Sequence, residues 1–380
     1  MASYRYWTTH LVTGQVLADN IPLTVQSFGR QINGVGQLTG SLNLAKNTTA
    51  QNTVYLEALE PRRTLIWAAQ DDFPVWCGIV WDWPHQSIAD STLPIAASTP
   101  ESLFQHRQID ANLSFTGKDA FAIFAALQNF AISKTPNGAM AGLQQPVGTP
   151  AAASGVTLSL NYQAADLRKV YDAFGDLAAT AGFEWTYQPA LDASGNPIIV
   201  PLLGYPRLGT PITTSQLVFQ YPGNAYDYAY PRTGSSSANA LIATAPPNGA
   251  ALPWQSQYPH GRDDVDLAAG YPLLEDTISY AGTGVTSQAQ INAYADGKLP
   301  AHTGAQESPS VSLAPGARPL IREINLGDYA WLLATSPLHP AGPNGEPGLQ
   351  TQARISGWTC TPPGANQTET IKIQLGGLAA

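Results

Sequence analysis

The stretch Val75-Trp-Cys-Gly-Ile-Val-Trp-Asp-Trp83 is the part of the sequence from which the fold is best predicted. It is a short apolar run with a glycine inside it, and strand-like runs lie on either side, at 63–69 and 91–97. Apolar runs of this length, bounded by polar turns, are typical of buried β-strands. The sequence therefore predicts the order strand, loop, strand, turn, strand in this region.

A similar order recurs near the other end of the chain. Tyr329–Leu333 is apolar, Ala353–Cys360 carries a glycine next to Trp and Cys, and Glu369–Leu375 alternates apolar with polar residues. Gly78 and Gly357 hold equivalent places in the two regions. Two interpretations stay open at this point. The chain holds either a duplicated β-domain, with one copy at each end, or two unrelated hairpins that both contain glycine.

The composition favours many turns and short strands over a helical bundle. Of 380 residues, 44% are hydrophobic and 12% are charged, about half the usual charged share. The chain also holds 34 glycines and 31 prolines, which fit a β-rich fold with many turns. Depletion of charge is typical of interface cores, so we expect a protein that lies within an assembly. A chain of this length predicts about two to four domains.

Charge and cysteine content exclude several classes of protein. A net charge of −9 argues against a sequence-specific nucleic-acid reader, which needs a basic face. Two cysteines, Cys77 and Cys360, are too few for a disulfide framework, and their matching places predict small buried residues. The first ten residues lack the features of a signal peptide. No apolar run approaches the ~20 residues that span a bilayer, so we expect assembly in a cytoplasm and no membrane-spanning segment.

The pattern along the chain predicts an α+β protein that is mainly β. We expect two tube-like β-barrel or sandwich domains and two insert domains. The predicted boundaries are a first β-domain at 1–115, an α/β insert with two helices and a hairpin at 116–212, a split second β-domain at 213–232 and 306–380, and a loop-rich insert with one helix at 233–305.

Three segments have the pattern of helices. Lys118–Ile132 is apolar nearly all round, and Ala164–Ala181 carries apolar residues at i, i+3, i+4 and i+7. Gly182 is placed to end the second of these helices in left-handed geometry. The third helix begins after Ser287, which has a glutamine three residues on as in a capping box, and is expected to end at Gly297.

Few residues form candidate chemical sites. The densest polar cluster, His260–Asp266, is either a site for a divalent cation or a solvated loop. Asp192–Asn196 has part of a calcium loop but no glutamate at the twelfth position, so a hairpin turn is predicted. His85, His106 and His339 have no Cys or His partner at metal-ligand spacing.

Catalytic patterns are equally sparse. Paired carboxylates for glycoside cleavage need only be close in space, and Asp71, Asp72, Asp82 and Asp110 are the candidates, although charges that border strands are usually at the surface. The sequence contains no nucleophile elbow, zinc-peptidase helix or P-loop. We therefore predict no enzyme and assign no catalytic, cofactor-binding or metal-binding residues.

Several short motifs occur in the predicted order of elements: Arg30-Gln-Ile-Asn33 with Ser41-Leu-Asn-Leu44, Trp76-x-Gly78-Ile-Val80, Gly182-Phe-Glu-Trp185, Gly270-Tyr-Pro-Leu-Leu-Glu275 and Gly327-Asp328. In these motifs and in its order of elements, the chain resembles the tail-tip hub, a minor tail protein, of long-tailed siphophages that infect actinobacteria. That family is related to the baseplate hub of contractile phages. The resemblance covers nearly the whole chain.

The resemblance implies a structural role in the virion. Such hubs are homotrimers in which each chain supplies two tube-like domains, so that three chains form a ring of six. The ring adapts the six-fold tail tube and distal tail protein to a three-fold tip and forms part of the DNA-ejection channel. Implied partners are further copies of the chain, the distal tail protein, the C-terminus of the tape-measure protein and other minor tail or tip proteins. The implied location is the tail tip of the virion, after assembly in the host cytoplasm.

A second function follows from the residues alone. Nine Trp and sixteen Tyr are consistent with a carbohydrate- or receptor-binding β-protein, because aromatic faces stack on sugars. If the chain instead encloses a channel for DNA, its acidic balance predicts a neutral or negative lining along which DNA slides.

Overall fold

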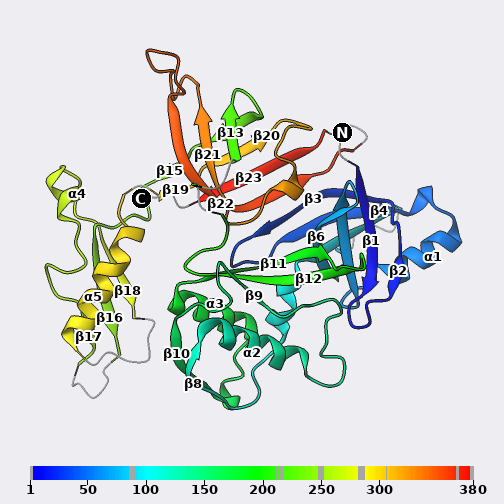
Figure 1. Ribbon diagram of the computed structural model, residues 1–380, viewed down its shortest axis with the longest axis horizontal. Coiled ribbons are helices and arrows are strands. Elements are labelled where there is room, and N and C mark those ends of the chain that lie inside the picture. The colour runs from blue at the N-terminus through cyan, green and yellow to red at the C-terminus, as the bar shows by residue number, and fades with distance from the viewer. Residues whose placement is uncertain are drawn as a thin grey trace. The chain divides into compact units, whose positions relative to one another are not determined.

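The computed structural model of the chain describes residues 3–84, 91–210, 213, 217–246, 252–280, 287–304, 306–364 and 368–376. The protein is mainly β, as predicted, with 41% strand and 20% helix. It divides into two compact units (Figure 1): a main unit of residues 1–228 and 310–380, and a small unit of residues 229–309.

The largest sheet has 13 strands and draws them from both ends of the chain. Their order is β14-β20-β23-β22-β3-β4-β7-β6-β5-β1-β2, and β21 pairs with both β22 and β13. The strands are β1 (Tyr4–His10), β2 (Val16–Ala18), β3 (Leu23–Gln31), β4 (Gln37–Asn43), β5 (Thr64–Gln70), β6 (Phe73–Asp82), β7 (Thr92–Ser98), β13 (Leu217–Tyr221), β14 (Ala225–Ala229), β20 (Ser310–Leu313), β21 (Tyr329–Ala334), β22 (Leu349–Thr361) and β23 (Thr370–Gly376).

The expectation of closed barrels is wrong for the described parts of the chain. No sheet there closes on itself. The reason is the pairing of β3, which hydrogen-bonds to β4 along its first part and to β22 along its last part. Strands from the two predicted β-domains therefore continue into one open sheet. The predicted four-domain division stays a prediction.

Two three-stranded meanders occupy the places of the two similar sequence regions. β5, β6 and β7 pair in succession as antiparallel neighbours, and so do β21, β22 and β23. Each meander has a glycine where the next strand approaches closely. A Cβ on Gly78 would lie 2.6 Å from the carbonyl oxygen of Ser98, and one on Gly357 would lie 3.0 Å from that of Arg30. The two cysteines, one in each meander, are buried and unbonded, as predicted.

One helix in the first region was not predicted. Helix α1 (Thr49–Ala58) begins after Thr48, whose hydroxyl accepts a hydrogen bond from the Gln51 backbone, while the Gln51 side chain accepts one from Thr48. This capping box is visible in the sequence. The helix buries only Ala58. It therefore has no apolar stripe, and a search based on periodicity misses it.

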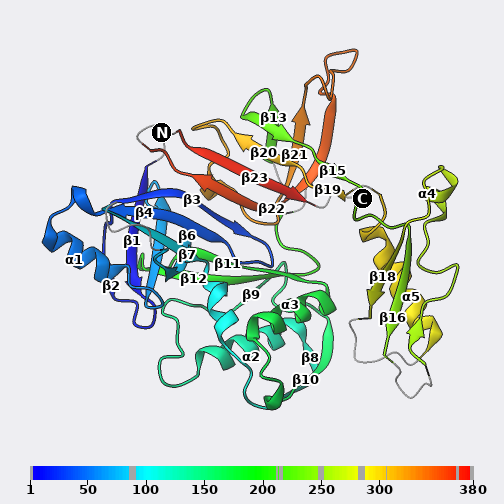
Figure 2. The same ribbon diagram turned by 180° about the vertical axis from the view of Figure 1, so that it is seen from behind.

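The predicted α/β insert packs two helices against a small sheet. Phe124 of α2 and Phe174 of α3 stack with ring centroids 4.0 Å apart, and both side chains are fully buried. Figures 1 and 2 show both helices on one side of β11 and β12. The elements are α2 (Ala120–Ile132), α3 (Val170–Ala181), β8 (Leu113–Asp119), β10 (Thr157–Tyr162), and the sheet β11 (Glu184–Leu191), β12 (Pro197–Gly204) and β9 (Val147–Thr149).

The helix boundaries differ from the prediction at one end. The helix expected at Ala164–Ala181 begins only at Val170. Leu167 has φ of 43°, a left-handed conformation that is incompatible with a continuous α-helix. Gly182, with φ of 72°, ends α3 as predicted. The expected hairpin after it is formed by β11 and β12.

The small unit contains more structure than the single helix predicted there. Its sheet is β17 (Trp254–Gln255), β16 (Ala240–Ala245) and β18 (Glu275–Ser279), and its helices are α4 (Asp264–Ala268) and α5 (Gln288–Lys298). A further ladder pairs β15 (Arg232–Thr233) with β19 (Gln306–Glu307).

Helix α5 covers the sheet of the small unit. Its Ile291 and Ala295 pack against Ala243 and Ala245 of β16. The hydroxyl of Ser287 caps the helix as predicted. The helix continues through the glycine that was expected to stop it and ends one residue later. Among the helices that the structure describes, none combines the length and the apolar character that a membrane span requires.

Candidate functional site

At the end of strand β3, the first strands of the chain contact the last meander and the α/β insert. Phe28–Gln31 pairs with β22, and Trp76 Nε1 on β6 donates a hydrogen bond of 2.8 Å to the Gly29 carbonyl. The α/β insert reaches the same place through β11. We use the name β3 junction for the five residues Arg30, Asn33, Glu101, Trp185 and Tyr187.

Polar groups of the β3 junction occupy one edge of β11. Arg30 Nη2 donates to the Tyr187 carbonyl over 2.8 Å, and the Tyr187 N–H donates to Glu101 Oε1 over 3.1 Å. The Asn33 N–H donates to the Trp185 carbonyl over 2.9 Å, and Asn33 Oδ1 accepts from the Trp185 N–H over 2.8 Å. These groups take the place of a neighbouring strand. They satisfy backbone groups that would be costly to bury unpaired.

Glu101 is the buried acid of the junction. It lies on the 3-10 helix η3 (Pro100–His106) and is 2% exposed. Burial raises the pKa of its carboxyl to about 7, although Arg30 and the backbone hydrogen bonds favour the charged form. Within the described ranges, its Oε2 has no hydrogen-bond partner. The carboxyl therefore changes its protonation state near neutral pH.

A second polar cluster, built on the buried Arg354, fastens the insert to the other half of the sheet. Arg354 of β22, 7% exposed, pairs with both carboxylate oxygens of Glu184 on β11, and the Nη1–Oε1 distance is 2.8 Å. The same guanidinium donates to the carbonyls of Leu208, over 3.0 Å, and Gly327, over 3.1 Å. Every charge here has several partners, which is the condition under which a buried ion pair is tolerated.

A third cluster joins the first strand to the last meander. The hydroxyl of Tyr4 donates to the buried carboxylate of Glu369. Gln70 Nε2 donates to the Tyr4 oxygen over 3.0 Å and to Glu369 over 3.1 Å, while Cys360 Sγ lies 3.4 Å from the Tyr4 hydroxyl. Burial raises the pKa of the Cys360 thiol to about 12 and that of Tyr4 far above its usual value. Both groups therefore stay protonated at neutral pH.

Sequence motifs contain some of these residues and not others. Arg30 and Asn33 belong to one motif of the resemblance, and Glu184 and Trp185 belong to another. Glu101 lies in none of the motifs, and neither does the arginine of β22. Both residues lie among mixed polar and apolar neighbours, so the local sequence does not reveal their burial or their distant partners.

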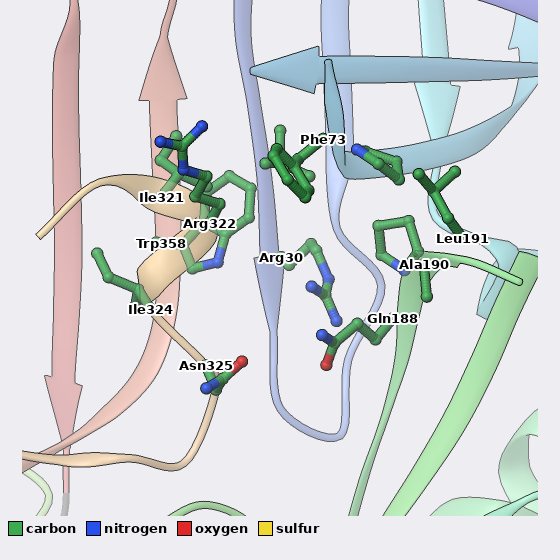
Figure 3. A pocket seen from close by; sticks show the side chains of 13 residues that line it. Arg30, Phe73, Gln188, Ala190, Leu191, Ile321, Arg322, Ile324, Asn325 and Trp358 are labelled. Carbon is green, nitrogen blue, oxygen red and sulfur yellow. The ribbon is translucent and has the colours of Figure 1, made fainter. Parts of the chain in front are cut away.

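A cavity of about 330 Å³ lies beside the β3 junction (Figure 3). It opens between β3, the end of β11 and the segment 321–325. Its walls combine polar and apolar side chains, among them Arg30, Phe73, Gln188, Arg322, Asn325 and Trp358. A second cavity of about 620 Å³ shares Gln188 and Asn325 with the first, so the two adjoin.

The predicted polar cluster of the small unit is satisfied by its own neighbours. His260 Nδ1 lies 2.7 Å from Asp296 Oδ2, and Asp263 caps α4 by accepting from two backbone N–H groups. Arg262 forms an ion pair with Asp264 over 3.1 Å. Nowhere in the described parts of the chain do three His, Cys, Asp or Glu side chains gather in a way that could hold a metal ion.

The remaining single candidates also have structural partners. Asp192 accepts from the backbone N–H groups of Ser194 and Asn196, each over 2.8 Å, in the β11–β12 turn, as predicted. His106 lies against Trp81, with ring centroids 4.5 Å apart. His339 Nδ1 lies 2.8 Å from the Tyr228 hydroxyl. His85 lies outside the described residues.

The structure places Asp82 far from two of the other candidate carboxylates. Asp71 and Asp72 precede β6 and Asp82 ends it, so about 30 Å of strand separates them at ~3.3 Å per residue. Glycosidase carboxylates lie roughly 5–9.5 Å apart. Asp110 instead forms an ion pair with Lys134 over 2.8 Å.

At the level of sequence, no protein-family model and no curated protein matches the chain. The fold nevertheless resembles solved phage-tail structures. The 43 kDa tail protein of prophage MuSo2 from Shewanella oneidensis has a TM-score of 0.56 at 11% identity, with 98% of this chain and 96% of that chain covered. The tail protein from Neisseria meningitidis MC58 has a TM-score of 0.56 at 12% identity, with 98% and 97% covered.

A third similar structure is a chain of the Francisella PdpA–VgrG complex, with a TM-score of 0.55 at 9% identity. The match covers 99% of this chain and 58% of that chain. At these identities the likeness establishes a shared fold. The chain therefore has the fold of phage tail proteins, while the assignment to phages of actinobacteria stays a prediction.

Proposed function

We propose that this chain is a structural subunit of a phage tail-tip or baseplate hub. The observation that carries the proposal is the match of fold over 98% of this chain and 96–97% of two phage tail proteins. The two meanders within one open sheet support it, since a hub of this kind needs two similar β-units in each chain. The three buried polar clusters suit a rigid part, because they fasten the insert and both ends of the chain together.

In the proposed assembly the chain is a homotrimer. Three chains place six β-units in a ring that adapts the six-fold tail tube and distal tail protein to a three-fold tip and forms part of the DNA-ejection channel. The terminal strands of the branched main sheet, β2, β13 and β14, carry edges that a closed ring would cover. The proposed partners are the distal tail protein, the C-terminus of the tape-measure protein and other tip proteins. No enzymatic activity is part of this proposal.

Mass photometry of the purified chain, alone and with the distal tail protein of the same phage, tests the oligomeric state. The proposal predicts a species of three 40.3 kDa chains that gains mass when the distal tail protein is added. A chain that stays monomeric in the presence of that protein contradicts it.

The alternative of a glycan-binding β-protein receives less support. Five of the nine tryptophans are buried and form the core of the main unit, where no sugar can stack on them: Trp7, Trp67, Trp76, Trp185 and Trp358. A glycan array is the direct test of this alternative. Selective binding to one class of glycan would revive it.

A further inference from the structure

The cavity beside the β3 junction differs in charge from the rest of the chain. The whole sequence has 27 acidic and 18 basic residues, yet the cavity is lined by two arginines, Arg30 and Arg322, and by no carboxylate. The amides of Gln188 and Asn325 add further polar groups. This surrounding favours an anionic ligand.

Two buried donors among the residues that line the cavity have no acceptor in the part of the chain that the structure describes. Trp358 is 2% exposed, and in the described residues its Nε1 has no hydrogen-bond partner. The same holds for Nε of Arg30, which is the cross-strand neighbour of Trp358 in the β3–β22 ladder. Buried N–H groups are nearly always paired, so two unpaired donors beside one cavity indicate a ligand that accepts hydrogen bonds.

The donors are also held in fixed positions. Arg30 is anchored by its 2.8 Å hydrogen bond to the Tyr187 carbonyl. Arg322 lies 5.3 Å from the Phe73 ring centroid and forms an ion pair with Asp71 over 3.5 Å. Arg30 is therefore the arginine of the lining that has no ion-pair partner among the described residues. Figure 3 shows the Arg30 guanidinium among the labelled side chains, directed towards the amide of Gln188. A site that is already ordered binds its ligand with little loss of conformational entropy.

The rest of the lining is apolar and includes Phe73, Leu191, Ile321 and Ile324. We propose that this cavity binds a carboxylate carried on an apolar group. A planar carboxylate accepts from an arginine and a neighbouring N–H at once, and the apolar walls hold the group that carries it. A volume of about 330 Å³ admits one such side chain or a small free acid.

Isothermal titration calorimetry with four probes tests the proposal and separates the two sources of the carboxylate. The free acid 4-methylpentanoate is compared with 4-methylpentanamide, and the capped peptide Ac-Leu-Glu-Leu-NH2 with Ac-Leu-Gln-Leu-NH2. We expect at least one acid to bind about tenfold more tightly than its matched amide, as for loss of a charge-assisted hydrogen bond. Binding of the free acid alone identifies a small-molecule site. Binding of the glutamate peptide identifies a site for a protein segment. Equal binding of acids and amides, or no binding of either acid, overturns the proposal.

Two variants place the binding in this cavity. Trp358→Phe removes the N–H and keeps most of the ring, and we expect acid binding to weaken about tenfold. Trp254→Phe is the matched control, because Trp254 also has a buried Nε1 without a partner in the described residues but lies in the small unit and does not line the cavity. We expect this control to bind as the wild type does. Arg322→Gln, at a more exposed position, is expected to weaken acid binding and leave amide binding unchanged. A folded Trp358→Phe variant that binds acids like the wild type contradicts the proposal.

Discussion

Glu101 is the residue for which the stability of the fold should depend most clearly on pH. Burial raises the pKa of its carboxyl to about 7 in the folded chain, against 4.5 for an ordinary glutamate. The folded state therefore holds this proton more tightly than the unfolded state does. Its contribution to stability is complete below pH 4.5 and is lost as the pH rises through about 7.

We expect Glu101→Gln to remove this loss. Between pH 5 and pH 8, the free energy of unfolding of the wild type should fall relative to the variant by on the order of 2 kcal/mol. Urea unfolding at several pH values measures the difference. Asp110→Asn is the control. Lys134 lowers the pKa of that exposed carboxyl, so Asp110 stays deprotonated between pH 5 and pH 8. If the free energy of unfolding changed with pH equally in the wild type and in Glu101→Gln, protonation of Glu101 would not be coupled to folding.

The Glu184–Arg354 pair predicts non-additive effects. Glu184→Gln leaves the buried Arg354 without its counter-charge and should lower the free energy of unfolding by about 3–5 kcal/mol. Arg354→Met leaves Glu184, whose side chain is 19% exposed, and should lower it by less. The double variant should cost clearly less than the sum of the two, because it leaves no unpaired charge. A double-mutant cycle by chemical denaturation gives the coupling energy. Simple additivity would contradict the structural role assigned to the pair.

Replacing two glycines by alanine should change stability in opposite directions. Gly175 lies exposed inside α3, and a Cβ added there would meet nothing within 4 Å, so Gly175→Ala should stabilise the protein by about 0.5–1 kcal/mol. Gly209 has φ of +90°, and a Cβ there would lie 1.9 Å from the Gly327 carbonyl carbon. Gly209→Ala should therefore destabilise the protein by more than Gly175→Ala stabilises it. Thermal unfolding of both variants provides the comparison, and a shift of the same sign in both would refute it.

The elements differ in how far the sequence predicts them. The meanders, α2, the end of α3 and the β11–β12 hairpin follow from local periodicity and turn residues. The sheet of the small unit does not, because β16 pairs in parallel with β18, about 35 residues further on. The ion pair between Glu184 and Arg354 joins residues 170 positions apart, and charged residues are expected at the surface until the fold is known.

The small unit should be the less stable part of the whole molecule. Its core cluster is Ala243, Ala245, Ile291 and Ala295, whereas the main unit buries many large aromatic side chains. A small apolar core supplies little hydrophobic stabilisation. Apolar side chains also remain exposed on the unit, such as Leu252 at 75% and Val265 at 81%.

Native-state hydrogen exchange tests this difference in stability. We expect amides of β16 and α5 to exchange faster than those of β5, β6 and α2 in the isolated chain. Assembly should slow exchange in the small unit if its exposed apolar residues become covered. Equal protection of the two units in the isolated chain would contradict the prediction.

In the proposed assembly, three chains lie around one axis. Cryo-electron microscopy of the chain assembled with its distal tail protein would show this arrangement. We expect a three-fold ring in which the two meanders of each chain alternate at six positions around a channel, with a neutral or negative lining. A ring of any other symmetry, or a complex in which each chain contributes only one β-unit, would contradict it.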